Sequence, residues 1–287
     1  LQDLKEHRLH TDLKSNERLF YFTTCGWMMW NWLVGGLASG AAIVLYDGSP
    51  MEPAADSLFQ LVDDLEISVF GTSASYLASV EKQGVHPADH FDLRRLRMIL
   101  STGSPLTDEG FQYVYRDIKS DLCLSSISGG TDIVSCFALG NPNLPVRSGQ
   151  LQCRGLGMAV DVFNRDGEGV IDEKGELVCT QPFPSMPLRF WQDARGVAYQ
   201  QAYFDRYPNI WCHGDFAKIT VEGGMIIYGR SDAILNPGGV RIGTAEIYAH
   251  VIPIEEVIDC VVVGQEWEGD SRIAQKRIEF RSPVSRK

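Results

Sequence analysis

Several patterns that would mark a specialised chain are missing from this sequence. The seven cysteines form no C-x-x-C pair, so neither a cysteine-based zinc site nor a disulfide framework is indicated, and we expect reduced thiols and a cytosolic location. Lys and Arg number 26 against 37 Asp and Glu, and the formal charge of −11 argues against a nucleic-acid partner. There is also no internal repeat, low-complexity segment or signal-peptide pattern.

An uninterrupted apolar run long enough to span a membrane is missing too. The most apolar stretch, residues 25–45, contains Asn31, four glycines and a cluster of Trp and Met. It predicts a buried helix followed by a strand, and no membrane partner. With 44% hydrophobic and 22% charged residues, the 287 residues predict a globular chain, long enough for one large domain and part of another.

The first half of the sequence predicts an open, mostly parallel α/β sheet. Short β-prone runs lie at 18–24, 42–46, 69–70, 96–101 and 122–125. Helical periods lie between or beside them, at 1–13, 26–38, 54–65, 73–82 and 108–119. Strands that alternate with helices through short loops form parallel βαβ units, whose ligands bind beyond the carboxyl ends of the strands.

After about residue 149 the pattern changes to short strands separated by turns. The runs at 159–163, 175–179, 216–221 and 225–228 predict an antiparallel β subdomain. The segments 246–250 and 257–263 then predict the start of a small α+β domain. From Ile273 onward we find no clear period, and we expect a frayed end rather than a regular element.

Residues 228–246, YGRSDAILNPGGVRIGTAE, hold the densest group of chemically informative residues. Glycines on either side provide backbone freedom around Arg230 and Arg241. Two guanidinium groups presented from turns suit an anionic ligand such as a phosphate. A hairpin with two solvated arginines is the alternative that the spacing alone leaves open.

Two further Gly-bearing segments follow predicted strands, Gly103-Ser104-Pro105 and Ser128-Gly129-Gly130-Thr131-Asp132. Because both strands should end at one edge of the sheet, both segments should enter one crevice. Small residues let a flat base lie close to the backbone, while a Thr hydroxyl and a neighbouring carboxylate can bind a phosphate oxygen and Mg²⁺. Taken singly, each segment can equally be a strand-to-helix turn with an N-capping Thr or Asp.

The pattern G-R-S-D-x-x-L-N-x-x-G-x-R-I-G-T-A-E-I, which begins at Gly229, resembles the hinge motif of the adenylate-forming superfamily, which contains the acyl-CoA synthetases. The resemblance implies part of a large domain over residues 1–230, a hinge at 231–232 and an incomplete small domain over 233–287. It also implies that Arg230 touches the nucleotide, that Asp232 is the pivot, and that Arg241 faces the phosphates.

The two Gly-bearing segments also resemble signatures of this superfamily. The resemblance implies that the first, Gly103, Ser104 and Pro105, packs on adenine. It implies that the second, with Gly130 and Thr131, holds the nucleotide, the Thr hydroxyl binding the α-phosphate. Asp132 stands where relatives have Glu, so we expect it near Mg²⁺ with a reach shorter by one methylene. Thr131, Asp132 and Arg241 are thus the candidate catalytic residues.

The segment W-C-H-G-D at 211–215 resembles the motif whose Asp accepts hydrogen bonds from both ribose hydroxyls, which implies that role for Asp215. The alternative is an Asp that caps a turn before a strand at Phe216. His213 stands where relatives usually have Thr, and we assign it no catalytic part.

The helix start at 27–29 resembles the part of acyl-CoA synthetases that lines the acyl pocket, which makes Trp27, Met28 and Met29 candidates for that pocket. Part of that cluster also belongs to the core. Gly129 stands where acetate-using relatives carry Trp, so we expect room for a longer acid, and we expect Gly129→Trp to favour acetate. Over residues 1–272 the resemblance narrows to the acetoacetyl-CoA synthetases.

That family uses ATP, Mg²⁺ and coenzyme A to convert acetoacetate, through an acyl-adenylate, to its thioester. The resemblance also implies a Gly/Ser/Thr-rich phosphate loop before this region and a catalytic Lys after it, and the 287 residues contain neither in context. We therefore expect a fragment with impaired activity. A synthetase for acetate, propionate or another short acid, and a non-catalytic nucleotide-binding remnant, stay open as alternatives.

Overall fold

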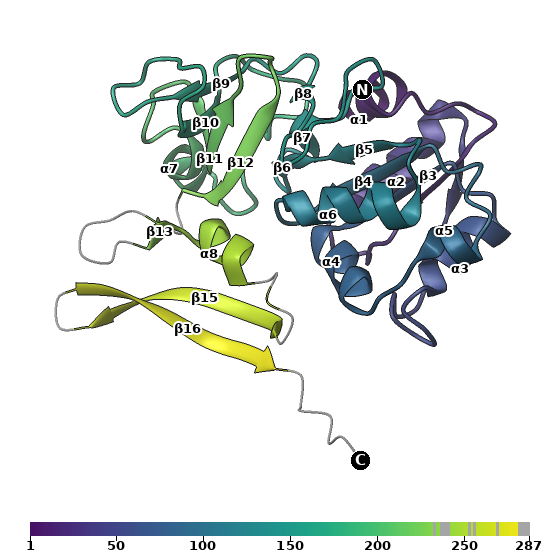
Figure 1. Ribbon diagram of the computed structural model, residues 1–287. Helices are drawn as coiled ribbons and strands as arrows, with labels where there is room; N and C mark the ends of the chain where they lie inside the picture. Colours follow the sequence, from purple (N-terminus) through teal and green to yellow (C-terminus); the bar gives the residue numbers. More distant parts are fainter. Residues whose placement is uncertain (232–233, 236–241, 252–253, 255–256, 268–269, 281–287) are drawn as a thin grey trace.

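The computed structural model describes residues 1–231, 234–235, 242–251, 254, 257–267 and 270–280 (Figure 1). A parallel sheet surrounded by helices forms the first half of the chain, and antiparallel sheets form most of the second. Helix α8 (Thr244–Val251) and the hairpin β15 (Val257–Trp267) and β16 (Asp270–Phe280) lie below them in Figure 1. The structure therefore confirms the predicted order along the chain: a parallel α/β sheet, then antiparallel sheets, then a small α+β segment.

The parallel sheet has five strands in the order β2-β1-β3-β4-β5, and every neighbouring pair is parallel. The strands are β1 (Arg18–Tyr21), β2 (Ala42–Val44), β3 (Val69–Ser73), β4 (Met98–Thr102) and β5 (Cys123–Ser126). Between β1 and β2 the chain forms α2 (Met29–Gly35) and the 3₁₀ turn η2 (Gly36–Ser39). This is the βαβ unit that the sequence predicts.

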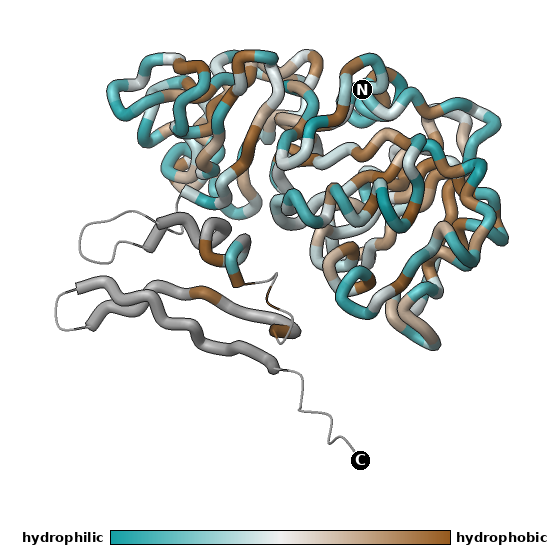
Figure 2. Tube along the Cα trace, in the orientation of Figure 1, coloured by the Kyte–Doolittle hydropathy of each residue, from teal (hydrophilic) through white to brown (hydrophobic). Residues whose placement is uncertain are grey.

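Successive residues of each strand point to opposite faces of the sheet, and each face has its own core. Phe70 and Ile99 face the helices α3 (Ser57–Asp64), α4 (Ala74–Lys82), α6 (Asp108–Tyr113) and η3 (Val114–Ile118). Val69, Met98 and Leu100 face α2 and the strand β7 (Ser135–Leu139). Figure 2 shows hydrophobic residues gathered along these strands. The sheet is buried on both faces, as parallel sheets require.

Residues 128–230 form two antiparallel sheets. One has the order β12-β11-β10-β9, from β9 (Val160–Phe163), β10 (Gly175–Cys179), β11 (Trp211–Ile219) and β12 (Met225–Arg230). The other joins β6 (Ser128–Gly130), β7 (Ser135–Leu139) and β8 (Cys153–Arg154), and lies between the first sheet and the parallel one in Figure 1. A bridge between Leu151 and Met225 links the two antiparallel sheets.

Several elements differ from the sequence-based expectation. The segment from Ile273 is not frayed, because residues up to Phe280 form β16 and pair with β15. Residues 128–130 form the strand β6 rather than a loop, and the strands β7 and β8 were not predicted. Short helices α5 (Pro87–His90) and α7 (Val197–Tyr203) were also missed. Each of these elements depends on a partner distant in sequence or is too short to show a period.

The expected first helix forms as α1 (Gln2–Lys5) followed by one π-helical turn, η1 (Glu6–His10). Two short strands, β13 (Ile234–Leu235) and β14 (Ile242–Gly243), pair just after β12. In the part of the chain that the structure describes, no helix combines the length and the apolar character needed to cross a membrane.

Candidate nucleotide and acyl site

A cavity of about 350 Å³ opens beyond the carboxyl ends of the parallel strands. Its wall brings together segments that are far apart in the sequence. The predicted site residues that line it are Trp27, Met28, Met29, Gly103, Ser104, Pro105, Gly129, Gly130, Thr131, Asp215 and Arg230. Arg241 and Asp232 lie outside the described residues, so their positions stay predictions. Asp132 lines an adjoining cavity.

The apolar wall of this cavity is the start of α2. Met29 is buried in the core of the sheet, while Trp27 and Met28 are half-buried. The ring of Trp27 meets the edge of Tyr21, with centroids 5.9 Å apart. Gly103, at the end of β4, lies beside the Trp27 ring, since an added Cβ would be 3.7 Å from it, and its φ of +91° is a conformation that favours glycine. The wall is therefore firm and hydrophobic, as an acyl-binding surface should be.

Gly129 lines the cavity, and the neighbouring strand β7 leaves no room for a side chain at this position. A Cβ added there would lie 2.0 Å from the carbonyl oxygen of Ser135 and 2.8 Å from Cα of Cys136. These atoms belong to β7, which pairs with β6. A Trp at position 129 could therefore refill a pocket only if β7 moved, because a side chain there meets neighbouring backbone.

Asp215 and Arg230 are cross-strand neighbours on β11 and β12. The Asp215 side chain is 10% exposed, and its Oδ1 lies 3.6 Å from Nη1 of Arg230, whose side chain is 47% exposed. Trp211, His213 and Asp215 share the buried face of β11. The alternative of a turn-capping Asp is wrong, since Asp215 lies inside a strand and lines the cavity with a largely buried carboxylate.

His213 has a structural role at the site. His213 Nε2 lies 3.1 Å from the carbonyl oxygen of Gly129 and 3.6 Å from Oδ2 of Asp215. Its ring packs against Phe137, with centroids 4.7 Å apart, and it fills the space beside Gly130, where a Cβ would lie 2.7 Å from the imidazole. His213 therefore connects the strand that carries Asp215 to the glycines of β6.

A second, polar cavity of about 290 Å³ adjoins the first and shares Gly129, Gly130, Thr131 and Arg230 with it. Asp132 lies on its wall and accepts a hydrogen bond from the hydroxyl of Tyr203. Among the described side chains, no group of three or more His, Cys, Asp or Glu could hold a metal ion. A carboxylate beside a phosphate site is nevertheless the donor set that Mg²⁺ commonly uses, since it keeps several waters.

Two tyrosines at the site were not found from the sequence. Tyr203, at the end of α7, stacks on Trp211 with ring centroids 3.6 Å apart and an interplanar angle of 15°. Tyr248 of α8 lines the larger cavity, and its hydroxyl accepts a hydrogen bond from the backbone N–H of Val262 at 3.0 Å. The aromatic run near 199–211 could have drawn attention to Tyr203, but its contact with Asp132, 71 positions away, is set by the tertiary fold.

The backbone just before the predicted hinge is held firmly. The N–H of Ser231 donates to the carbonyl oxygen of Gly214 at 2.7 Å, and its hydroxyl donates to Oε1 of Glu176 at 2.5 Å. Glu176 is 1% exposed and forms an ion pair with Arg206. A firm end to β12 fits a boundary at 231–232, although residues 232–233 themselves lie outside the described part.

Comparison with known proteins shows what this chain resembles. It is 60% identical over 273 residues to the acetoacetyl-coenzyme A synthetase of Rhizobium meliloti, a match that covers 95% of this chain and 42% of that protein. It is 50% identical over 275 residues to the acetoacetyl-CoA synthetase of Gallus gallus, with 95% and 41% covered. This chain is homologous to part of the acetoacetyl-CoA synthetases.

Solved structures agree with that relationship. The acetoacetyl-CoA synthetase of Streptomyces lividans superposes with a TM-score of 0.89 at 43% identity, covering 99% of this chain and 43% of that one. An anthranilate CoA ligase in complex with anthranoyl-AMP superposes with a TM-score of 0.79 at 17% identity, which shows a common fold. No protein-family model matches the chain. The chain spans about two fifths of the length of the acetoacetyl-CoA synthetases that it matches.

Proposed function

We propose that this chain is part of an acid–thiol ligase that activates acetoacetate with ATP and transfers the acyl group to coenzyme A. The observation that carries the proposal is the convergence of Thr131, Asp215 and Arg230 on one cavity beside an apolar wall. These three residues come from separate motifs, and relatives that match 95% of the chain are named acetoacetyl-CoA synthetases.

In the nucleotide half of the cavity, each residue has a chemical task. The Asp215 carboxylate can accept hydrogen bonds from both hydroxyls of a ribose, and Arg230 can interact with the nucleotide beside it. Thr131, exposed at the end of β6, can donate its hydroxyl to an α-phosphate oxygen. The exposed segment of Gly103, Ser104 and Pro105 provides a flat surface for a base.

The acid half is the wall of Trp27, Met28 and Met29. A carboxylate held there can approach the α-phosphorus in line with the departing pyrophosphate, so that catalysis consists of positioning and of stabilising charge. Mg²⁺, when bound, would neutralise phosphate charge, and Asp132 is the residue that would hold it. Arg241 is proposed to face the same phosphates.

For the second half-reaction we propose rotation of the small domain about 231–232, with Asp232 as the pivot, so that the coenzyme A thiol displaces AMP. The anchored backbone of Ser231 supports a hinge that begins there.

We also propose a cytosolic location. All six cysteines whose side chains the structure describes are free, which fits a reducing compartment.

A binding experiment tests the nucleotide part of the proposal. Isothermal titration of AMP into the 287-residue chain should show binding, and Asp215→Ala should weaken it at least tenfold, because a buried carboxylate that pairs with a diol makes charge-assisted hydrogen bonds. Asp166→Ala, in an exposed turn of the same subdomain, is the matched control and should bind as the wild type does.

Equal affinity in the Asp215 and Asp166 variants would contradict the proposed site. A chain that binds AMP normally but whose intact natural form makes no acyl-adenylate from acetoacetate, acetate or propionate would instead favour a non-catalytic nucleotide-binding protein. Adenylate formation from acetate or propionate in preference to acetoacetate would favour a synthetase for a shorter acid.

A further inference from the structure

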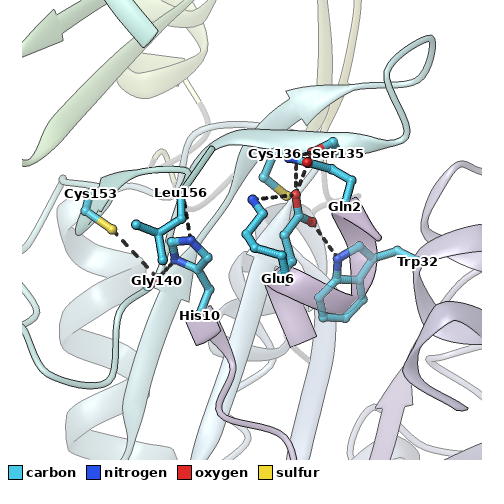
Figure 3. A network of polar contacts seen from close by, with 10 residues as sticks. Gln2, Glu6, His10, Trp32, Ser135, Cys136, Gly140, Cys153 and Leu156 are labelled. Carbon is cyan, nitrogen blue, oxygen red and sulfur yellow. Dashed lines mark hydrogen bonds and ion pairs between the residues drawn. The ribbon is translucent and has the colours of Figure 1, made fainter. Parts of the chain in front are cut away.

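A buried carboxylate lies directly behind the cavity. Glu6 of η1 has no exposed surface, and its two oxygens receive hydrogen bonds from different directions (Figure 3). Oε1 accepts from the hydroxyl of Ser135 at 2.5 Å and from the backbone N–H of Cys136 at 3.1 Å. Oε2 accepts from the indole N–H of Trp32 at 2.9 Å. Lys5 Nζ lies 3.4 Å from Oε1.

The partners of Glu6 belong to the two walls of the cavity. Ser135 and Cys136 are the residues of β7 that pair with Gly130 and Gly129 of β6, and Cys136 itself lines the cavity. Trp32 lies one helical turn after Met29, in the helix that forms the apolar wall. One carboxylate therefore joins the glycine strand and the acyl-pocket helix through opposite oxygens.

Other residues of the N-terminal helix complete this connection. Gln2 Nε2 donates to Oγ of Ser135 at 3.1 Å. The ring of His7 lies against Trp32, with centroids 4.0 Å apart, and its Nε2 lies 2.8 Å from the carbonyl oxygen of Trp32. Burial lowers the pKa of His7 to about 4, so the ring is neutral at physiological pH and donates from Nε2. The helix thus holds Trp32 at both its backbone and its indole.

A carboxylate in this position is costly unless all of its donors stay in place. Burying an ionised group is unfavourable, and hydrogen bonds from several fixed donors offset the cost only when the geometry is good. The same arrangement makes the distance between its donors hard to change. If α2 moved away from β7, either the Trp32 indole or the Cys136 N–H would lose its partner in a buried place.

We propose that Glu6 is a positioning residue that fixes the spacing between the Gly129–Gly130 strand and the start of α2, and so sets the width of the acyl part of the cavity. The effect on acid recognition rests on the proposed function, whereas the coupling of the two walls does not. Glu6 touches neither the nucleotide nor the acid, and it acts through Trp32 and β7.

The test compares Glu6→Gln with Glu17→Gln. An amide keeps the size of the side chain but presents an NH₂ to one of the facing donors, so one of the two walls must shift. Glu17 is a matched control, because its carboxylate receives two hydrogen bonds from Arg97 at 2.5 and 2.7 Å near the amino ends of β1 and β4, at the opposite edge of the sheet from the cavity.

The first measurement is a ¹H–¹⁵N correlation spectrum of the 287-residue chain. In Glu6→Gln we expect the backbone amide signals of Gly129 and Gly130 and the indole signals of Trp27 and Trp32 to move, and in Glu17→Gln we expect them to stay. Trp32→Phe, which removes one donor from the other wall, should also move the two glycine signals. If Glu6→Gln does not fold, this variant carries the test.

The second measurement uses the intact natural enzyme. Glu6→Gln should raise KM for the acid roughly tenfold while kcat and KM for ATP change less, because a lost hydrogen bond to a charged group is worth about that factor or more. Glu17→Gln should lower the melting temperature without changing KM for the acid. Comparing KM for the acid with the melting temperature in the two variants distinguishes a positioning role of Glu6 from a general effect on stability.

Glycine signals that stay in place in both Glu6→Gln and Trp32→Phe would overturn the inference, as would a lower melting temperature in Glu6→Gln with unchanged KM for the acid. If the glycine signals move as expected while the wild-type enzyme forms no adenylate from any short acid, the proposed function fails and the coupling of the walls by Glu6 stands.

Discussion

Asp132 and Tyr203 form a pair in which one side chain orients the other. The hydroxyl of Tyr203 donates to Asp132, and its ring is fixed by stacking on the fully buried Trp211. Burial, followed by the hydrogen bond to Asp132 and the negative charge of that residue, raises the pKa of Tyr203 above its usual range, so the phenol stays protonated and donates. The phenol therefore limits the rotation of the Asp132 carboxylate.

We predict that Tyr203→Phe weakens the Mg²⁺-dependent part of ATP binding by roughly three- to tenfold, the value of one hydrogen bond, because the ring stays stacked while the carboxylate loses its donor. Calorimetric titration of ATP with and without Mg²⁺ measures this. Binding of AMP without Mg²⁺ should be unchanged.

Tyr199→Phe is the matched control for that prediction. The Tyr199 hydroxyl is buried and has no hydrogen-bond partner among the residues that the structure describes, and its ring lies in the same aromatic cluster, 6.0 Å from Tyr203 and 6.2 Å from Trp211. Removing its hydroxyl should therefore leave ATP binding unaffected. An equal loss in the two variants would show that the cluster as a whole, and not the Tyr203 hydroxyl, supports the site.

At the scale of elements, the strand pair β6 and β7 decides the shape of the cavity. We predict that Gly129→Ala destabilises the chain by about 1–3 kcal/mol, the usual cost of overpacking, because its Cβ would lie 2.0 Å from the Ser135 carbonyl oxygen. Since the strand pair must open, activity with acetoacetate and with acetate should fall together. Urea unfolding of the 287-residue chain and adenylate formation by the intact enzyme measure the two effects.

Gly26→Ala is the control for the strand-pair prediction, because the nearest atom to an added Cβ there, Oγ1 of Thr24, is 3.8 Å away. It should be about as stable as the wild type. A Gly129→Ala variant with wild-type stability, or with activity lost only for the longer acid, would mean that β7 can shift without cost and that position 129 selects the acid after all.

For the molecule as a whole, we predict that the 287 residues by themselves activate little or no acetoacetate. They match about two fifths of the length of the relatives, and we predict that a phosphate loop and a catalytic Lys lie in the remaining part. Removing a single donor to developing charge commonly costs about a hundredfold to a thousandfold in rate. We therefore expect acetoacetate-dependent exchange between ATP and pyrophosphate to be almost absent.

The measurement is the exchange rate of radioactive pyrophosphate into ATP, with an intact acetoacetyl-CoA synthetase assayed in parallel. AMP binding to the 287-residue chain is the internal control, since it shows that the cavity has folded. Exchange close to that of the intact enzyme would contradict the prediction and would mean that the described cavity supplies the essential groups by itself.

Sequence patterns alone determined the order of elements in the first half and most of the site. Alternating strands and helices predict the parallel sheet, because hydrophobic period is a local property. The places of Thr131, Asp215 and Arg230 in three separate motifs, which the resemblance assigns to one nucleotide, predict that these residues converge. The structure confirms the sheet and brings these three residues to one cavity.

The tertiary structure alone decided the contacts between segments that are distant in sequence. Nothing near Glu6 indicates that its carboxylate bonds to Ser135, 129 positions away, and nothing near Gly129 shows that β7 excludes a side chain there. The strand β16 forms only because β15 supplies its partner. Hydrogen bonds and close packing depend on distances across the fold, which local propensity does not encode, so the sequence indicated which residues form the site while the fold determined what holds them in place.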